Sequence, residues 1–127
     1  MNRKALIAAV GIAGLAATPA FAATTAAKAT QLSERVAHTS VKAGTKDGVS
    51  GTLRSGGTGL SGQRVMLERR TGSSRMFTTV STHTTGRNGG VSFTVTVPKG
   101  RTAYELVYPG NGTYKASHSN IVTVTAR

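Results

Sequence analysis

The chain has 127 residues, no cysteine, and 16 Lys and Arg residues against 4 Asp and Glu residues, which gives a net charge of +12. This length allows one domain and leaves no room for a separate catalytic domain, and the lack of cysteine excludes disulfides. Four carboxylates supply poorly either a calcium cage or the paired acids of a glycosidase.

The first 22 residues have the pattern of a cleaved signal peptide. Arg3 and Lys4 give a basic start, residues 5–17 are apolar, and residues 20–22 read Ala-Phe-Ala, the small-x-small pattern of a cleavage site. We expect cleavage between Ala22 and Ala23. The apolar stretch covers only about 20 Å of a hydrocarbon core that is about 30 Å thick. We therefore expect an exported chain, secreted or associated with the cell envelope, with no transmembrane segment after processing.

The charge remains high after this cleavage. Removing Arg3 and Lys4 with residues 1–22 leaves a net charge of +10 on 105 residues. Such a positive field favours association with acidic polysaccharide, cell-wall polyanion or anionic lipid headgroups. Nucleic acid is a less expected partner outside a cell. The alternative is that the scattered charge only keeps the protein soluble. No cofactor is expected, and the identity of any partner stays open.

Residues 23–34 are rich in Ala and Thr without periodicity, so we expect a flexible leader before a domain that spans residues 35–127. A first strand is expected between Val36 and Val41. The next run, residues 49–53, leads into a glycine-rich turn at residues 55–59, and residues 63–70 then form a strand with Val65 and Leu67 directed inward.

The second half of the chain continues this alternation. Residues 76–84 form an expected strand with Phe77 and Val80 contributing apolar surface, and three further strands are expected at residues 91–97, 104–108 and 120–125. The inward positions of these three strands are Val91, Phe93, Val95, Val97, Tyr104, Leu106, Tyr108, Val122 and Val124. Seven strands without a helix after residue 22 predict an all-β, seven-stranded antiparallel sandwich.

Several of these segments resemble a known family. Residues 49–53 (VSGTL), 62–67 (GQRVML), 88–95 (NGGVSFTV) and 104–110, with Tyr114, are similar to the bacterial immunoglobulin-like domains of exported actinobacterial proteins. The resemblance covers about residues 36–126 and implies an immunoglobulin-like β-sandwich of a non-enzymatic module. It implies a corner hydrogen bond from Tyr104 to the backbone and a place for Tyr114 over one end of the sandwich. Gly59 and Gly86 depart from the family, which usually has proline and an acidic residue there.

Two motifs are interpreted as structural. Residues 57–62 satisfy G-x-G-x-x-G, but no helix follows to receive a pyrophosphate, so we expect a hairpin or loop. His38, His83 and His118 lack metal-ligand spacing and have few acidic residues to orient them. We expect neither a metal site nor catalysis.

One local feature indicates binding. If residues 71–74 form a hairpin loop, Arg70 lies directly across from Arg75, and Arg64 shares the sheet face of Arg70. Like charges placed opposite each other are destabilising, so an anion bound by Arg64, Arg70 and Arg75, with Arg69 at the sheet edge, is one hypothesis. The alternative is that Glu68 neutralises the group.

Three functions remain open at this point. The first is a secreted, non-enzymatic immunoglobulin-like module that acts by surface contact. The second is a basic binder of acidic glycans or cell-wall polyanions, for which the charge is the distinguishing feature. The third is an enzyme or a metal protein, which the motifs do not favour.

Overall fold

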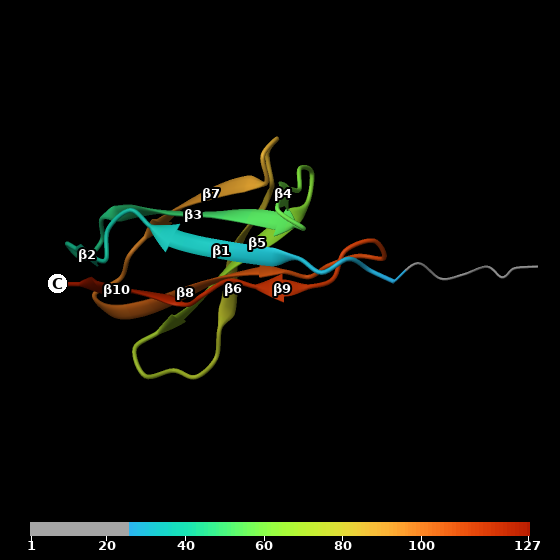
Figure 1. Cartoon of the computed structure of the whole chain (residues 1–127). Coiled ribbons are helices and arrows are strands. Elements are labelled where there is room, and N and C mark those ends of the chain that lie inside the picture. The colour runs from blue at the N-terminus through green and yellow to red at the C-terminus, as the bar shows by residue number, and fades with distance from the viewer. Residues whose placement is uncertain (1–25) are drawn as a thin grey trace, which may run out of the picture.

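The computed structural model describes residues 26–127, and this part of the chain contains two packed β-sheets and no helix (Figure 1). The first sheet has the order β1-β3-β4, and β7 also pairs with β3; the second has the order β2-β10-β8-β5-β6, and β9 also pairs with β8. The strands are β1 (Gln31–Val36), β2 (Ser40–Val41), β3 (Lys46–Ser55), β4 (Thr58–Gly59), β5 (Arg64–Thr71), β6 (Thr78–Thr84), β7 (Gly90–Thr96), β8 (Gly100–Tyr108), β9 (Ser117–His118) and β10 (Val122–Ala126). The expected cleavage site at Ala22 and Ala23 lies outside the described residues.

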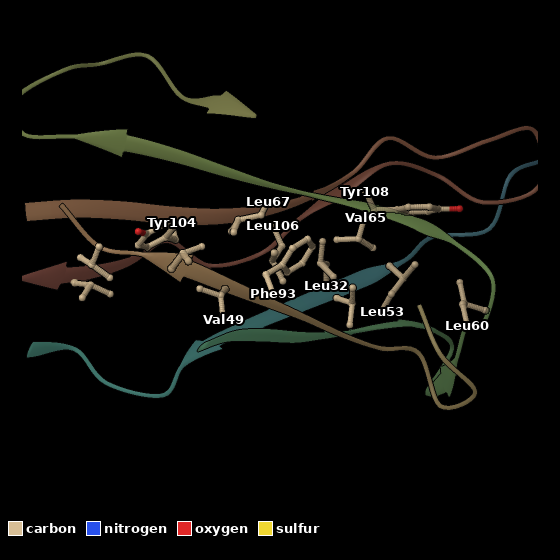
Figure 2. Packing of buried hydrophobic residues seen from close by; sticks show 14 of the residues in the cluster. Leu32, Val49, Leu53, Leu60, Val65, Leu67, Phe93, Tyr104, Leu106 and Tyr108 are labelled. Atoms are coloured by element: carbon tan, nitrogen blue, oxygen red, sulfur yellow. The ribbon is translucent and has the colours of Figure 1, made fainter. Parts of the chain in front are cut away.

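Alternation of apolar and polar residues produces the core between the sheets. Along β7 the buried side chains Val91, Phe93 and Val95 alternate with exposed Ser and Thr residues, as the period of two predicts. Figure 2 shows Phe93 of β7 between the two layers, where Leu106 of β8 and Leu67 of β5 also lie. The buried cluster comprises Leu32, Val49, Leu53, Leu60, Val65, Leu67, Val91, Phe93, Val95, Val97, Tyr104, Leu106, Tyr108, Val124 and Ala126. Each large side chain in it contributes about 1.5–3 kcal/mol of burial free energy.

The expected strand at residues 76–84 is shorter in the structure, and Val80 is not a core residue. β6 begins at Thr78, and the side chain of Val80 is 40% exposed. The register between β5 and β6 shifts after Leu67, which pairs with Ser81 while Glu68 pairs with Thr79. Val80 is the extra residue of this β-bulge, so its side chain has no opposite partner.

The first strand begins earlier than the sequence indicates. β1 occupies Gln31–Val36 and pairs antiparallel with β3, so residues 31–34, expected in the leader, belong to the sheet. The inward positions of β1 include Leu32 and Glu34, both 7% exposed. A buried carboxyl group among the inward positions interrupts the apolar alternation that would have marked the strand.

A close approach of two backbone segments accounts for a departure from the family pattern. A Cβ atom at Gly59 would collide with the carbonyl of Asn88, and one at Gly89, whose φ is +81°, would collide with the carbonyl of Leu53. The hairpin of β3 and β4 therefore packs directly on the turn before β7. The G-x-G-x-x-G segment is part of this hairpin, as expected.

Two pairings depart from a purely antiparallel sandwich. β2 pairs parallel with β10, and Lys28 forms an isolated parallel bridge with Tyr114. Tyr114 is half-buried against the core, in the position that the family resemblance implied for it. Three of the ten strands, β2, β4 and β9, have only two residues.

Candidate contact surface

The outward face of β5 carries the side chains at every second position. Val65 and Leu67 are fully buried, so Arg64, Met66, Glu68 and Arg70 point away from the core. At about 3.3 Å per residue, Arg64 and Arg70 lie about 20 Å apart along the strand. This distance is too great for one small anion to contact both.

The predicted pairing of Arg70 with Arg75 is wrong. The ladder of β5 and β6 ends at the pair Arg69 and Thr78, so Arg75 lies in the connection between the strands. Arg70 pairs instead with Ala103 of β8. The connection is longer than the four-residue loop that would have placed the two arginines opposite each other, because β6 begins two residues later than expected.

Arg69 points to the opposite side of β5 and pairs with Tyr104. Burial raises the pKa of the Tyr104 phenol, and the nearby charge of Arg69 opposes this rise. The Tyr104 hydroxyl is buried and has no hydrogen-bond partner within residues 26–127. The corner hydrogen bond implied by the family resemblance is therefore not formed.

A second arginine, which the sequence did not single out, joins Arg70 at one end of the outer face. Arg70, Arg101 and Thr123 surround a shallow hollow over Ala103, and Gly72 and Ser73 complete its lining. The position follows from the register, because Ala103 pairs with both Arg70 and Thr123, and Arg101 lies two residues before Ala103. Pairing of β5 with β8, in addition to β6, is the signal that would have found Arg101.

No carboxylate neutralises this basic end. Within residues 26–127 the side-chain ion pairs are His38 with Asp47 and His118 with Glu105, so Arg70 and Arg101 have no acidic partner there. Glu68, the alternative partner of these arginines, forms no ion pair with them within the described residues. Glu68 instead accepts a hydrogen bond of 3.3 Å from the Thr79 hydroxyl. The hollow therefore presents two guanidinium groups and can bind an anion through paired N–H donors.

The segment that follows β5 forms an arm, defined here as residues 69–80. Figure 1 shows it at the bottom of the view, extending away from the two layers. The guanidinium of Arg70 lies 4.8 Å from the centre of the Phe77 ring, a cation–π contact that holds the two sides of the arm together. The backbone N–H of Gly72 donates to the carbonyl of Arg101 at 2.8 Å, which ties one side of the arm to β8.

Carboxylates gather in the middle of the same outer face. Glu68 pairs directly with Glu105 across β5 and β8, and the Nδ1 atom of His118 lies 3.6 Å from Glu105. No spacing in the sequence indicates that two of its four acidic residues are neighbours. Like charges at this spacing repel each other, and a protonated His118 would offset part of that repulsion.

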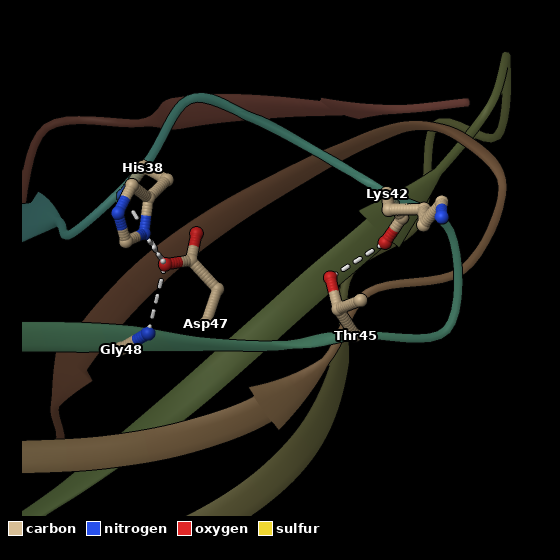
Figure 3. Close-up of polar contacts among 5 residues, drawn as sticks. All are labelled: His38, Lys42, Thr45, Asp47 and Gly48. Atoms are coloured by element: carbon tan, nitrogen blue, oxygen red, sulfur yellow. Dashed lines mark hydrogen bonds and ion pairs between the residues drawn. The ribbon is translucent and has the colours of Figure 1, made fainter.

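Each histidine has a different partner. The Nδ1 atom of His38 lies 3.2 Å from the buried carboxylate of Asp47, which also accepts hydrogen bonds from the backbone N–H groups of His38 and Gly48 (Figure 3). The ring of His83 meets the Phe93 ring edge to face at 4.8 Å. Within residues 26–127 no group of three or more His, Cys, Asp or Glu side chains could hold a metal ion.

The free edge of β1 is closed by a side chain. Asn120 accepts a hydrogen bond from the N–H of Glu34 and donates one to its carbonyl, both at 3.1 Å, so its amide acts as the next strand would. Burial raises the pKa of Glu34 to about 8, an effect that the Ser119 hydroxyl opposes and the charge of Glu105 increases. Ser119 Oγ accepts a hydrogen bond from the Leu106 N–H, donates one to the Asn120 carbonyl at 2.7 Å, and lies 3.4 Å from Glu34 Oε1.

Comparison with protein-family models and with curated protein sequences gives no match. Among solved structures, the D00-D0 domain of intimin aligns with 84% of this chain and 52% of its own, with a TM-score of 0.57 and 16% identity. Residues 26–127 thus have an all-β, bacterial immunoglobulin-like fold. The sporulation control protein Spo0M of Bacillus subtilis aligns with 77% of this chain and 50% of its own, with a TM-score of 0.44 and 14% identity. The chain thus spans about half the length of both structures. Residues 26–127 include no helix with the length and apolarity needed to cross a bilayer.

Proposed function

We propose that this chain is an exported, non-enzymatic immunoglobulin-like module that acts by contact with the cell envelope, like the modules of actinobacterial proteins that its sequence resembles. The fold shared with the intimin domain supports a surface-contact module. The observation that carries the proposal is the arm at residues 69–80, which extends away from the two layers (Figure 1) and leaves the apolar side chains of Met76 and Val80 exposed.

A second candidate is a binder of acidic glycans or cell-wall polyanions. The hollow over Ala103 supports it, because two arginines, Arg70 and Arg101, line it together with the hydroxyl-bearing residues Ser73 and Thr123. Sulfate, phosphate and carboxylate groups accept paired hydrogen bonds from arginine, and Arg101 is the exposed arginine of this lining. Repeating anionic groups on a polymer would engage this hollow together with the wider positive surface.

The proposal is tested by retention of residues 23–127 on isolated cell envelope at increasing ionic strength. The polyanion candidate predicts that the charge reversal Arg101→Glu weakens retention and reduces the dependence of retention on salt, because Arg101 is exposed and lies at the hollow. Arg64→Glu is the matched control, since Arg64 is also exposed and lies on the same face at the other end of β5. It changes the net charge equally.

Each outcome separates the candidates. Salt-sensitive retention that Arg101→Glu reduces and Arg64→Glu leaves largely unchanged supports the polyanion candidate. Retention that does not respond to salt supports a contact module that recognises its partner through uncharged surface. Absence of retention at physiological and at low salt contradicts both.

A further inference from the structure

The arm at residues 69–80 combines exposed apolar side chains with exposed charge. Three large apolar side chains are exposed in the described part of the chain: Met76 at 75%, Ile121 at 49% and Val80 at 40%. Two of the three belong to the arm and are four residues apart. Transfer of an exposed apolar side chain from water into an apolar phase lowers the free energy.

The charge of the arm has one sign. Residues 69–80 include Arg69, Arg70 and Arg75 and no acidic residue. Arg75 directly precedes Met76, and Arg70 stacks on Phe77, which brings guanidinium and apolar groups next to each other. Arg101 adds a further positive charge where Gly72 meets β8.

The backbone leaves the far side of the arm free to adapt. Residues 73–77 lie outside every strand, and their backbone contacts are short-range: the Ser74 N–H donates to the Thr71 carbonyl, and the Met76 N–H donates to the Ser74 hydroxyl. A segment with few long-range hydrogen bonds can adjust its side chains to a partner at low cost.

We propose that the arm docks on an anionic phospholipid surface, with Arg70, Arg75 and Arg101 at the phosphate groups and Met76 and Val80 entering the interfacial region. This inference rests on the proposed envelope contact and names its partner. A bilayer surface offers anionic phosphates and an apolar phase within about 5–10 Å of each other, which is the reach of one side chain. A soluble anionic polysaccharide offers only the charge and would leave Met76 in water.

The test measures co-sedimentation of residues 23–127 with vesicles that contain phosphatidylglycerol and phosphatidylcholine. This segment contains the entire hydrophobic core and every strand that the structure describes. We expect Met76→Ser to weaken binding about tenfold, as burial of one such side chain predicts, and Arg75→Ala to weaken it about fivefold. Ile121→Ser is the matched control, because Ile121 is also exposed but lies outside the arm, and it should bind as the wild type does.

A second readout separates this inference from the proposed function. Retention on an immobilised acidic polysaccharide should be unaffected by Met76→Ser. Wild-type vesicle binding by Met76→Ser, or equal binding to pure phosphatidylcholine vesicles, overturns the lipid inference. If the chain is retained on the polysaccharide or on isolated cell wall but not on vesicles, the lipid inference fails while the envelope contact stands; if it binds none of these, both fail.

Discussion

Two edges of the sandwich differ: the edge at β1 is covered by a side chain, whereas the arm at residues 69–80 is exposed. At β1 the N–H and carbonyl of Glu34 are hydrogen-bonded to the amide of Asn120, and the Glu34 side chain is buried. At the arm the strand pairing ends early, a bulge at Val80 interrupts the ladder, and arginine and methionine side chains face solvent. Unpaired strand edges invite aggregation, and natural proteins cover or distort them. β1 is therefore covered by a side chain, whereas the arm is distorted and exposed, as the contact proposed for it requires.

A substitution that disturbs the close packing of β1 should have the largest effect on stability. A Cβ atom at Gly51 would collide with the carbonyl of Ser33 and with the side chain of Leu106. Gly51→Ala should therefore lower the free energy of unfolding by about 3 kcal/mol, because backbone and core must both shift. Gly48→Ala is the control, since its Cβ would meet only the Ala37 side chain at 3.8 Å. Equal denaturant midpoints for the two variants would contradict close packing of β1.

Removal of the Asn120 amide should have the next largest effect. Asn120→Ala leaves the N–H and carbonyl of Glu34 without these partners, and we expect a loss of about 2 kcal/mol in unfolding free energy. Amide hydrogen exchange in β1 should accelerate at the same time. Ile121→Ala, at the exposed neighbouring position, should change stability by less than about 0.5 kcal/mol. Unchanged exchange in β1 would show that Asn120 does not close this edge.

The buried Glu34 gives a pH test of the same edge. Its pKa is about 8 in the folded chain and near 4.5 when unfolded, so the folded state binds the proton more tightly. The stability that the neutral form contributes is fully present below pH 4.5 and is lost as pH rises through about 8. Glu34→Gln should therefore flatten the decline, with higher stability than the wild type at about pH 9 in chemical denaturation. Parallel pH profiles for the two proteins would contradict burial of a neutral carboxyl group.

Changes in the arm should have the smallest effect on stability. Phe77→Ala removes the ring under Arg70, and an exposed cation–π pair contributes about 0.5–1 kcal/mol. We expect a thermal midpoint close to that of the wild type, together with weaker envelope retention. Phe93→Ala, which empties a core position, is the contrasting variant and should cost about 3–5 kcal/mol. A large stability loss from Phe77→Ala would place the arm in the structural core instead.

The core was predictable because its signal is local. Val91, Phe93 and Val95 alternate with polar residues along one strand, and the structure buries all three. The contact surface was less predictable, because it depends on which strands are neighbours. Arg101 lies beside Arg70 only because β8 pairs with β5. The position of Arg75 depends on the length of the β5–β6 connection, which the sequence alone does not determine.

The buried polar residues explain why the sequence does not predict β1 and its contacts. Glu34 occupies an inward position of β1, so the strand has the composition of a linker although it belongs to the sheet. Its partners, Ser119 and Asn120, are about 85 residues away in sequence, and no spacing rule connects them. Contacts between side chains this far apart in sequence can be predicted only when the register of the strands is known. Apolar alternation along one strand can be recognised without it.

Hydrogen exchange of residues 23–127, measured with and without isolated envelope, shows which part of the chain makes the contact. We propose that the arm and the adjoining start of β8 make it, while β1 only stabilises the fold. We expect new protection at residues 69–80 and around Arg101, with exchange in β1 unchanged. Protection confined to β1, β3 and β7, on the opposite sheet, would contradict it.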